Sequence, residues 1–234
     1  MAANPTLPEP ILPSSPYIDP IRTPRLTLRP FRASDLPAFH ALRTQAAVMQ
    51  WTSAGAIDAT ADATWKWMQR FMAPNDASTF NFAIVERRRE PDAQTSDGSS
   101  PRACSDVVGV VGYMGGGPPP AFEIGYMLRE EVWGLGYATE ALGAWMRAWW
   151  GLERRRRGKG GVEHGREIEE GGGGVDREKL VAVVQAENRA SRRVLERCGF
   201  EEIGERMERS KDEDVLCVIY EVARPDEKSG RKGE

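Results

Sequence analysis

The stretch EEVWGLGYATEALGAWMRAWW, residues 130–150, joins a glycine-containing turn directly to a helix. Its helical part, 137–150, carries one apolar stripe at the spacing of a buried helix face: Leu142, Trp145, Met146 and Trp149. The first backbone N–H groups of a helix have no partner within it, and the helix macrodipole favours negative charge there. Because Gly134, Gly136 and Ala138 have little or no side chain, a phosphate can approach the main chain closely. The turn is therefore predicted to bind an anionic ligand.

Two common phosphate-binding turns do not fit this stretch. A P-loop needs a lysine directly after its last glycine, and Tyr137 stands there instead. A dinucleotide-binding fingerprint needs glycine or alanine where Thr139 stands, and a β-α-β unit rather than a run of strands before it. What remains is the pyrophosphate-binding turn of another fold.

The periodicities along the rest of the chain predict a mixed α/β fold. Alternating or β-branched segments predict strands over 25–31, 79–87, 106–114, 120–128, 179–188, 200–207 and 213–223. Helical spacing predicts a helix that begins near Ser34 or Asp35, a second over about 60–73, and a third over 188–199 with Asn188 as its N-cap. The three strands before the glycine turn are expected to form an antiparallel meander. We therefore expect one mostly antiparallel central sheet with helices on both faces.

Composition divides the chain into one domain with irregular attachments. We predict a proline-rich tail over 1–21, a single domain over 22–223 and a charged tail over 224–234. Two stretches of loop composition, about 88–105 and 153–178, are predicted to be disordered insertions. The second contains four consecutive arginines, 154–157, which the following acidic EIEE run suggests are solvated rather than bound to nucleic acid.

Charge and cysteine content exclude several classes of protein. A net charge of -3 gives no general attraction for nucleic acid, and no apolar run is long enough to span a membrane. Three widely spaced cysteines and two histidines suggest neither a disulfide framework nor a metal site. The expected protein is cytoplasmic, with a nuclear location also open.

Four motifs, in this order, resemble the GNAT superfamily of acetyltransferases, and most closely its RimJ/RimL-type branch. They are TPRLTLRPFRASDLPAF (23–39), FEIGYML (122–128), EVWGLGYATEAL (131–142) and AENRASRRVLERCGF (186–200). The resemblance covers about 22–223 apart from the two insertions, and it implies the GNAT acyl-CoA N-acyltransferase fold.

The resemblance also implies acetyl-CoA as cosubstrate, with no metal. The pyrophosphate is then expected on the turn backbone, formed by Val132, Trp133, Gly134, Leu135, Gly136, Tyr137 and Ala138. The pantetheine arm is expected to pair with Met127 and Leu128, where their strand splays away from the next one, and Asn188 is placed in the same cofactor site. In this family the turn often begins with Gln or Arg, whereas this chain has Glu131. Backbone contacts are thus expected to hold the phosphates.

Acetyl transfer to an amine needs a base for the amine and a proton for the departing thiolate. Glu123 lies on the strand expected beside the thioester, between the small residues Ala121 and Gly125, and burial would raise its pKa toward that of a useful base. The alternative is a solvent-facing or salt-bridged glutamate. Many GNAT enzymes have a tyrosine at the position of Leu195, so the Rim-type resemblance suggests Ser191 as proton donor instead, against a capping or packing serine.

Trp51 follows the first predicted helix, in the segment where the family shapes its acceptor site, and acceptor contact is one interpretation of it. The predicted function is acetyl transfer by direct attack of a primary amine, most plausibly a peptide or protein N-terminal α-amine. The alternatives are a small-molecule (polyamine or metabolite) acetyltransferase and a non-catalytic CoA-binding interaction protein. The protein is expected as a monomer or a homodimer.

Overall fold

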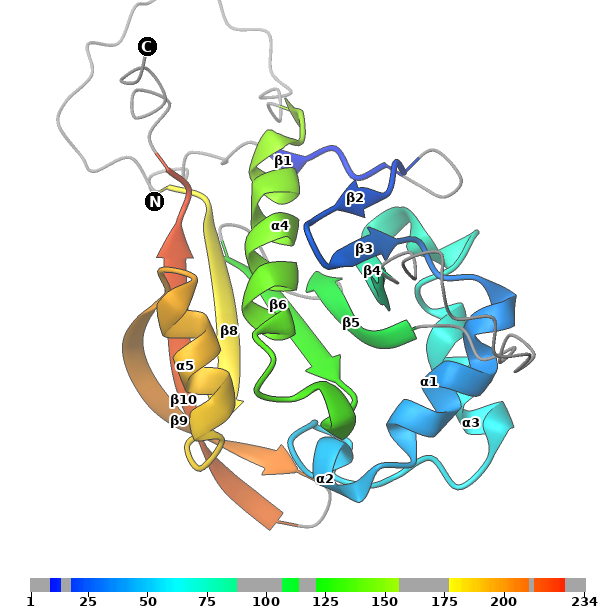
Figure 1. Ribbon diagram of the computed structural model, residues 1–234. Helices are drawn as coiled ribbons and strands as arrows, with labels where there is room; N and C mark the ends of the chain where they lie inside the picture. The colour runs from blue at the N-terminus through cyan, green and yellow to red at the C-terminus, as the bar shows by residue number, and fades with distance from the viewer. Residues whose placement is uncertain are drawn as a thin grey trace, which may run out of the picture.

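The computed structural model describes residues 9–13, 18–87, 107–113, 121–155, 177–210 and 213–225 (Figure 1). The predicted insertion over 88–105 lies outside the described residues, as does most of the predicted tail over 224–234. Within the described part of the chain, no helix is long and apolar enough to cross a membrane.

An eight-stranded sheet with the order β2-β3-β4-β5-β6-β8-β10-β9 forms the centre of the molecule. Its strands are β2 (Ile21–Arg22), β3 (Leu26–Arg29), β4 (Phe80–Glu86), β5 (Val107–Tyr113), β6 (Ala121–Leu128), β8 (Lys179–Gln185), β9 (Glu201–Ser210) and β10 (Glu213–Ala223). Neighbouring strands are antiparallel except β6 and β8, which are parallel. The mixed α/β class, the mostly antiparallel sheet and the meander of β4, β5 and β6 are confirmed.

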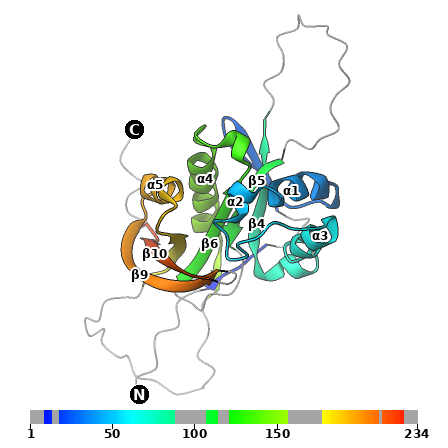
Figure 2. The ribbon, with the colours of Figure 1, turned by 90° about the horizontal axis from the view of Figure 1, so that it is seen from below.

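Helices cover both faces of this sheet, as predicted. The helices α4 (Tyr137–Gly151) and α5 (Arg189–Arg197) lie side by side on one face (Figures 1 and 2). On the other face, α1 (Leu36–Arg43) and α3 (Ala61–Gln69) pack against β4 and β5. A short helix, α2 (Ala46–Met49), was not predicted. The described residues also contain three 3-10 turns: η1 (Ala33–Asp35), η2 (Asn75–Ser78) and η3 (Glu130–Val132). The helix α3 ends four residues before its predicted end at 73.

Two apolar cores, one on each face, fix which way each strand residue points. The larger core packs α4 and α5 against the sheet, and the predicted stripe of α4 lies in it, with Trp145 and Trp149 fully buried and stacked at 5.2 Å. The smaller core packs α1 and α3 against β4 and β5 and includes Phe39 and Met68. Along β6, Tyr126 packs against the larger core and Met127 against the smaller one. Alternate side chains of β6 therefore point to opposite faces.

Arg154 and Glu178, at the two ends of the predicted insertion over 153–178, are not solvated, and this part of the prediction was wrong. Arg154 and Glu178 form an ion pair of 2.8 Å whose side chains are 8% and 5% exposed, and the indole of Trp149 donates to the same carboxylate. Burial of this pair is possible because each charge meets an opposite charge and hydrogen-bonding partners. The rest of the insertion, 156–176, lies outside the described residues.

Residues before the predicted start of the domain at residue 22 also pack against it. Residues Glu9–Pro10 form the strand β1, which pairs with β7 (Arg154–Arg155) next to the buried ion pair. Leu12 and Ile18 pack against the larger core. The proline-rich composition concealed this packing because two-residue strands and single apolar contacts leave no periodic signal.

Candidate active site

The parallel strands β6 and β8 diverge in the middle of the sheet. Their paired residues end with Glu123 opposite Val181, although β6 continues to Leu128 and β8 to Gln185. Beyond that point β6 stays paired with β5, and β8 stays paired with β10. We call this divergence, along residues 124–128 of β6, the splay. Its free strand edge can hydrogen-bond an extended ligand in the manner of an added strand.

Backbone groups on this edge alternate in direction. The N–H of Arg129 donates to the carbonyl of Val108 in β5, so the backbone of Met127, two residues earlier, also faces β5. The backbone groups of Tyr126 and Leu128 therefore face the splay. The Leu128 carbonyl already accepts a hydrogen bond of 2.9 Å from the indole of Trp133. Met127 was one of the two predicted pantetheine contacts. Because its backbone faces β5, only its side chain could contact the ligand.

The glycine turn leads from the splay into α4. Gly134 and Gly136 have φ angles of 76° and 80°, in the left-handed region that favours glycine. A methyl group added at Gly134 would meet no atom within 4 Å, so the space before the turn is open. The first N–H groups of α4 have no acceptor within the helix. The N-cap residue, Gly136, has no side chain that could accept from them. The turn has the geometry of an anion site.

The first two amides of the predicted phosphate-binding run already donate hydrogen bonds to backbone carbonyls. The N–H of Val132 donates to the Arg129 carbonyl, and that of Trp133 donates to the Glu130 carbonyl at 3.0 Å. The amides from Gly134 to Ala138 are therefore the stronger candidates for phosphate contacts.

Glu131 is held by groups at the base of the turn. Its carboxylate accepts hydrogen bonds of 2.9 Å from Arg129 and from the Gln45 amide, and these bonds lower its pKa to about 2. The Gln45 side chain also accepts from the N–H of Glu130, which ties the segment before α2 to the turn. The charge of Glu131 is thus paired with a cation beside it, and no sequence pattern indicates the contact with Gln45.

Arg25, which the sequence reasoning did not assign to the site, lies against the start of α4. Its guanidinium donates to the Leu135 carbonyl at 2.7 Å, pairs with Glu140 at 2.7 Å and lies over the ring of Tyr137. Glu140 also accepts from Thr23. These contacts fix the turn and place a positive charge beside the predicted anion site.

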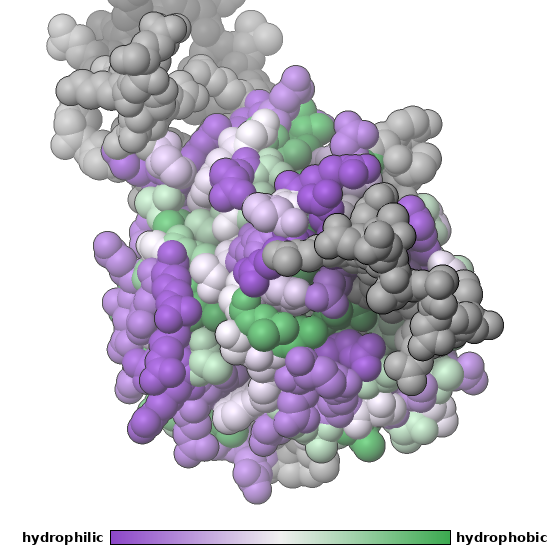
Figure 3. Space-filling model, in the orientation of Figure 1, coloured by the Kyte–Doolittle hydropathy of each residue, from purple (hydrophilic) through white to green (hydrophobic). Residues whose placement is uncertain are grey.

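The turn also exposes apolar side chains. Trp133 and Leu135 are 43% and 50% exposed. Figure 3 shows a hydrophobic patch near the middle of the face that carries α4 and α5, with hydrophilic side chains around it. An apolar ligand arm along this face would find hydrophobic surface.

Glu123 points to the face opposite α4 and α5. Its neighbour Phe122 packs on Trp149 of α4, with ring centroids 5.1 Å apart, so Glu123 projects the other way. The predicted alternation along β6 is therefore confirmed. The pKa of this carboxyl is raised, first by loss of hydration and then by the negative charge of Glu208, while Arg206 opposes the rise. The direction of the shift is the one that the sequence predicts, although the Glu123 side chain is exposed rather than buried.

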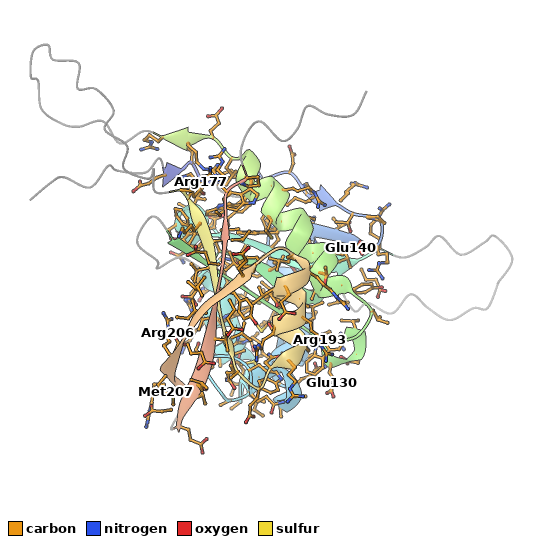
Figure 4. All side chains as sticks on the ribbon, turned by 90° about the vertical axis from the view of Figure 1, so that its left-hand side faces the viewer. Glu130, Glu140, Arg177, Arg193, Arg206 and Met207 are labelled. Carbon is orange, nitrogen blue, oxygen red and sulfur yellow. The ribbon has the colours of Figure 1, made fainter. Side chains whose placement is uncertain are left out.

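The residues that act on Glu123 come from β9, which curls beneath the sheet (Figure 2). Figure 4 shows Arg206 on the opposite side of the strands from Arg193 of α5. The face below the splay therefore carries two carboxylates, from Glu123 and Glu208, with one nearby guanidinium.

Ser191 lies on the other face, at the start of α5. Its N–H donates to the Asn188 side chain at 3.1 Å, so Asn188 is an N-cap, as predicted. The Ser191 hydroxyl is 2.7 Å from the hydroxyl of Tyr126, which projects from the middle of the splay. Leu195, one turn later, is fully buried. The serine thus points inward at the splay, and Tyr126 is a neighbour that the sequence reasoning missed.

Trp51 lies in a loop that is hydrogen-bonded to β8 and β9. The carbonyls on either side of it, of Gln50 and Thr52, accept hydrogen bonds from Gln185 of β8 and Ser210 of β9. The loop is closed by an ion pair of 2.6 Å between Arg43 and Asp58. In the parts of the chain that the structure describes, no group of three or more His, Cys, Asp or Glu side chains could hold a metal ion.

Comparisons with known proteins agree with this geometry. The GNAT acetyltransferase domain model matches residues 25–201. A search of curated protein sequences finds no significant match. The solved structures with the same fold include a GNAT-family acetyltransferase from Bacillus anthracis, with 19% identity and a TM-score of 0.61 over 88% of this chain and 99% of that one.

Two further similar structures contain coenzyme A. The ribosomal L7/L12 α-N-protein acetyltransferase RimL, in complex with coenzyme A, is 21% identical, with a TM-score of 0.61 over 88% of this chain and 98% of that one. A spermidine N-acetyltransferase from Vibrio cholerae, bound to CoA and spermine, is 15% identical, with a TM-score of 0.59 over 86% of this chain and 97% of that one. At these identities the structures support the fold, while the domain match covers most of the chain. The protein therefore belongs to the GNAT acetyltransferase family and is an acyltransferase.

Proposed function

We propose that this protein is an acetyl-CoA-dependent N-acetyltransferase of the RimJ/RimL type, which acetylates the N-terminal α-amine of a peptide or protein. The observation that carries the proposal is the splay, which opens beside an N-cap glycine turn and has a carboxylate on one face and a serine hydroxyl on the other.

The residues of the turn fit a CoA pyrophosphate. The space at Gly134 is open, Gly136 caps α4 without a side-chain acceptor, and Arg25 adds a guanidinium at the carbonyl of Leu135. Asn188 lies within one helical turn of Ser191, beside the splay. When bound, acetyl-CoA would supply an activated acetyl group as a thioester.

The two faces of the sheet separate the attacking and leaving groups. Glu123, on the face below the splay, accepts a proton from the attacking amine, directly or through water. Ser191, on the face of α5, donates its hydroxyl hydrogen to the departing sulfur and regains a proton from water. Backbone N–H groups along the splay are positioned to stabilise the oxyanion. The amine attacks the thioester directly, and no acyl-enzyme forms.

A primary amine is the proposed acceptor because Glu123 offers a carboxylate to it, whereas the neighbouring Glu208 is paired with Arg206. RimL is named for a protein α-amine and the Vibrio cholerae enzyme for spermidine. We favour a peptide because of the loop that carries Trp51. This loop is bound to β8 and β9 through the backbone carbonyls beside Trp51, so the Trp51 side chain can contact the peptide residues that follow the acetylated amine. Trp51 is half-buried, which suits a side chain at the rim of a site.

The experiment that tests this proposal measures thiol release from acetyl-CoA over a panel of N-terminal peptides and polyamines. We expect release with at least one peptide and acetylation of its α-amine by mass spectrometry. Release with polyamines alone would replace the peptide by a small amine. Binding of acetyl-CoA without release on any acceptor would instead support a non-catalytic CoA-binding protein.

Replacing Gly136 by alanine is expected to weaken CoA binding about tenfold, measured as Kd by calorimetry. An alanine in the left-handed region is strained by roughly 1–2 kcal/mol, and relief of that strain redirects the amides of the turn. Gly151→Ala at the far end of α4, where an added methyl group meets open space, is the control and should bind normally. A Gly136→Ala protein whose Kd stays within twofold of the wild type would contradict the phosphate site.

A further inference from the structure

Tyr126 has no role in the mechanism above, yet it projects from the middle of the splay. Its hydroxyl lies 2.7 Å from the Ser191 hydroxyl and 3.1 Å from the Ser191 carbonyl. The ring packs against the larger core, which fixes the hydroxyl in place. The two residues are 65 positions apart in the chain, and their hydroxyls meet where Ser191 of α5 faces Tyr126 of β6.

The hydrogen atoms of this pair can be counted. A tyrosine hydroxyl has one hydrogen, and here it has two acceptors, both on Ser191. If Tyr126 donates to the carbonyl, the short contact between the hydroxyls requires Ser191 to donate to Tyr126. If Tyr126 donates to the Ser191 hydroxyl oxygen, the hydrogen of Ser191 is released toward the splay. The second arrangement is the one that a departing thiolate needs.

We propose that Tyr126 is a positioning residue for Ser191: it donates a hydrogen bond to the Ser191 hydroxyl and so directs the serine hydrogen to the sulfur of the leaving group. This inference rests on the proposed function and names a further residue of the same site. A hydroxyl that accepts one hydrogen bond becomes a better donor of the next. Burial raises the pKa of Tyr126, so its hydroxyl keeps its hydrogen across the neutral pH range.

Acetyl transfer by four proteins tests the proposal: wild type, Tyr126→Phe, Ser191→Ala and the double variant. Tyr126→Phe should lower kcat about tenfold, with KM for acetyl-CoA within twofold. The double variant should be no slower than Ser191→Ala, because Tyr126 acts through the serine. Tyr220→Phe is the matched control, since it removes a tyrosine hydroxyl that bonds Arg192 of the same helix. Normal kcat in Tyr126→Phe, or equal losses in Tyr220→Phe, would overturn the inference.

A second measurement keeps the test independent of the acetyl acceptor. The thiol pKa of bound CoA is obtained from thiolate absorbance, as the difference between complexes with CoA and with desulfo-CoA. A directed Ser191 hydrogen stabilises the thiolate, so we expect this pKa to be about one unit higher in Tyr126→Phe than in the wild type, and unchanged in Tyr220→Phe. Equal pKa values in Tyr126→Phe and wild type would refute the role of Tyr126. A wild type that binds CoA but transfers no acetyl group would contradict only the proposed function.

Discussion

The Glu123→Gln protein is expected to turn over about a hundredfold more slowly than the wild type, the lower end of the range for loss of a general base. Glutamine preserves the shape of the side chain but cannot accept a proton from the amine. The effect should appear in kcat, while KM for acetyl-CoA changes little, because Glu123 lies on the face opposite Ser191 and the proposed leaving group. Steady-state thiol release with the best peptide measures both constants.

The pH dependence of kcat separates a base from a merely structural carboxylate. Glu123 works only when ionised, and its pKa is raised, so kcat of the wild type should fall as the pH drops through that raised value. The Glu123→Gln protein should lack this acidic limb. Glu208→Gln is the control: it removes the neighbouring charge that helps to raise the pKa, so the limb should move to lower pH without loss of the plateau. Near-normal turnover of Glu123→Gln at every pH would show that another group or a water chain is the base.

The Arg154→Ala protein is expected to lose about 3 kcal/mol of unfolding free energy, the low end of the cost of leaving a buried charge without its partner. The Glu178 carboxylate is 5% exposed and, among the residues that the structure describes, would keep Trp149 and a longer contact of 3.5 Å to Arg224. For a chain of this length the loss corresponds to a fall in Tm of about 6–12 °C. Urea unfolding followed by circular dichroism gives the free energy, and calorimetry gives the Tm.

Arg155→Ala is the control for this experiment, because its side chain belongs to the same short strand but is exposed. It should cost less than about 0.5 kcal/mol, as is usual for exposed positions. Equal small losses of unfolding free energy in both proteins would mean that the ion pair between Arg154 and Glu178 does not stabilise the fold, and would contradict its burial.

The sequence predicted most of the fold because its signals are local. The period-two runs of β4, β5 and β6 and the apolar stripe of α4 each lie within one segment, and each matches the element that forms. The glycine turn was found for the same reason. Gly134 and Gly136 were predicted to leave room for a phosphate, and the structure adds that both are left-handed and that Gly136 caps α4.

The missed features are contacts between distant segments. Tyr126 and Ser191 meet across 65 positions, and Arg25 reaches the turn from 110 positions away. The solvation predicted for Arg154 is wrong because a run of charged residues has the same sequence pattern whether or not one of its members is buried. In the same way, the sequence does not show that Arg129 and Gln45 bind the Glu131 carboxylate. Such pairings depend on how the sheet and helices pack, which no single segment encodes.

In the proposed mechanism a thioester lies in the splay, with its sulfur on the face of α5 and its acetyl group reachable from the face of Glu123. A crystal structure of the protein with CoA tests this placement. We expect the pyrophosphate on the amides from Gly134 to Ala138, and the sulfur within hydrogen-bonding distance of the Ser191 hydroxyl. A pantetheine arm that runs outside the splay, or a sulfur on the same face as Glu123 and away from Ser191, would contradict it.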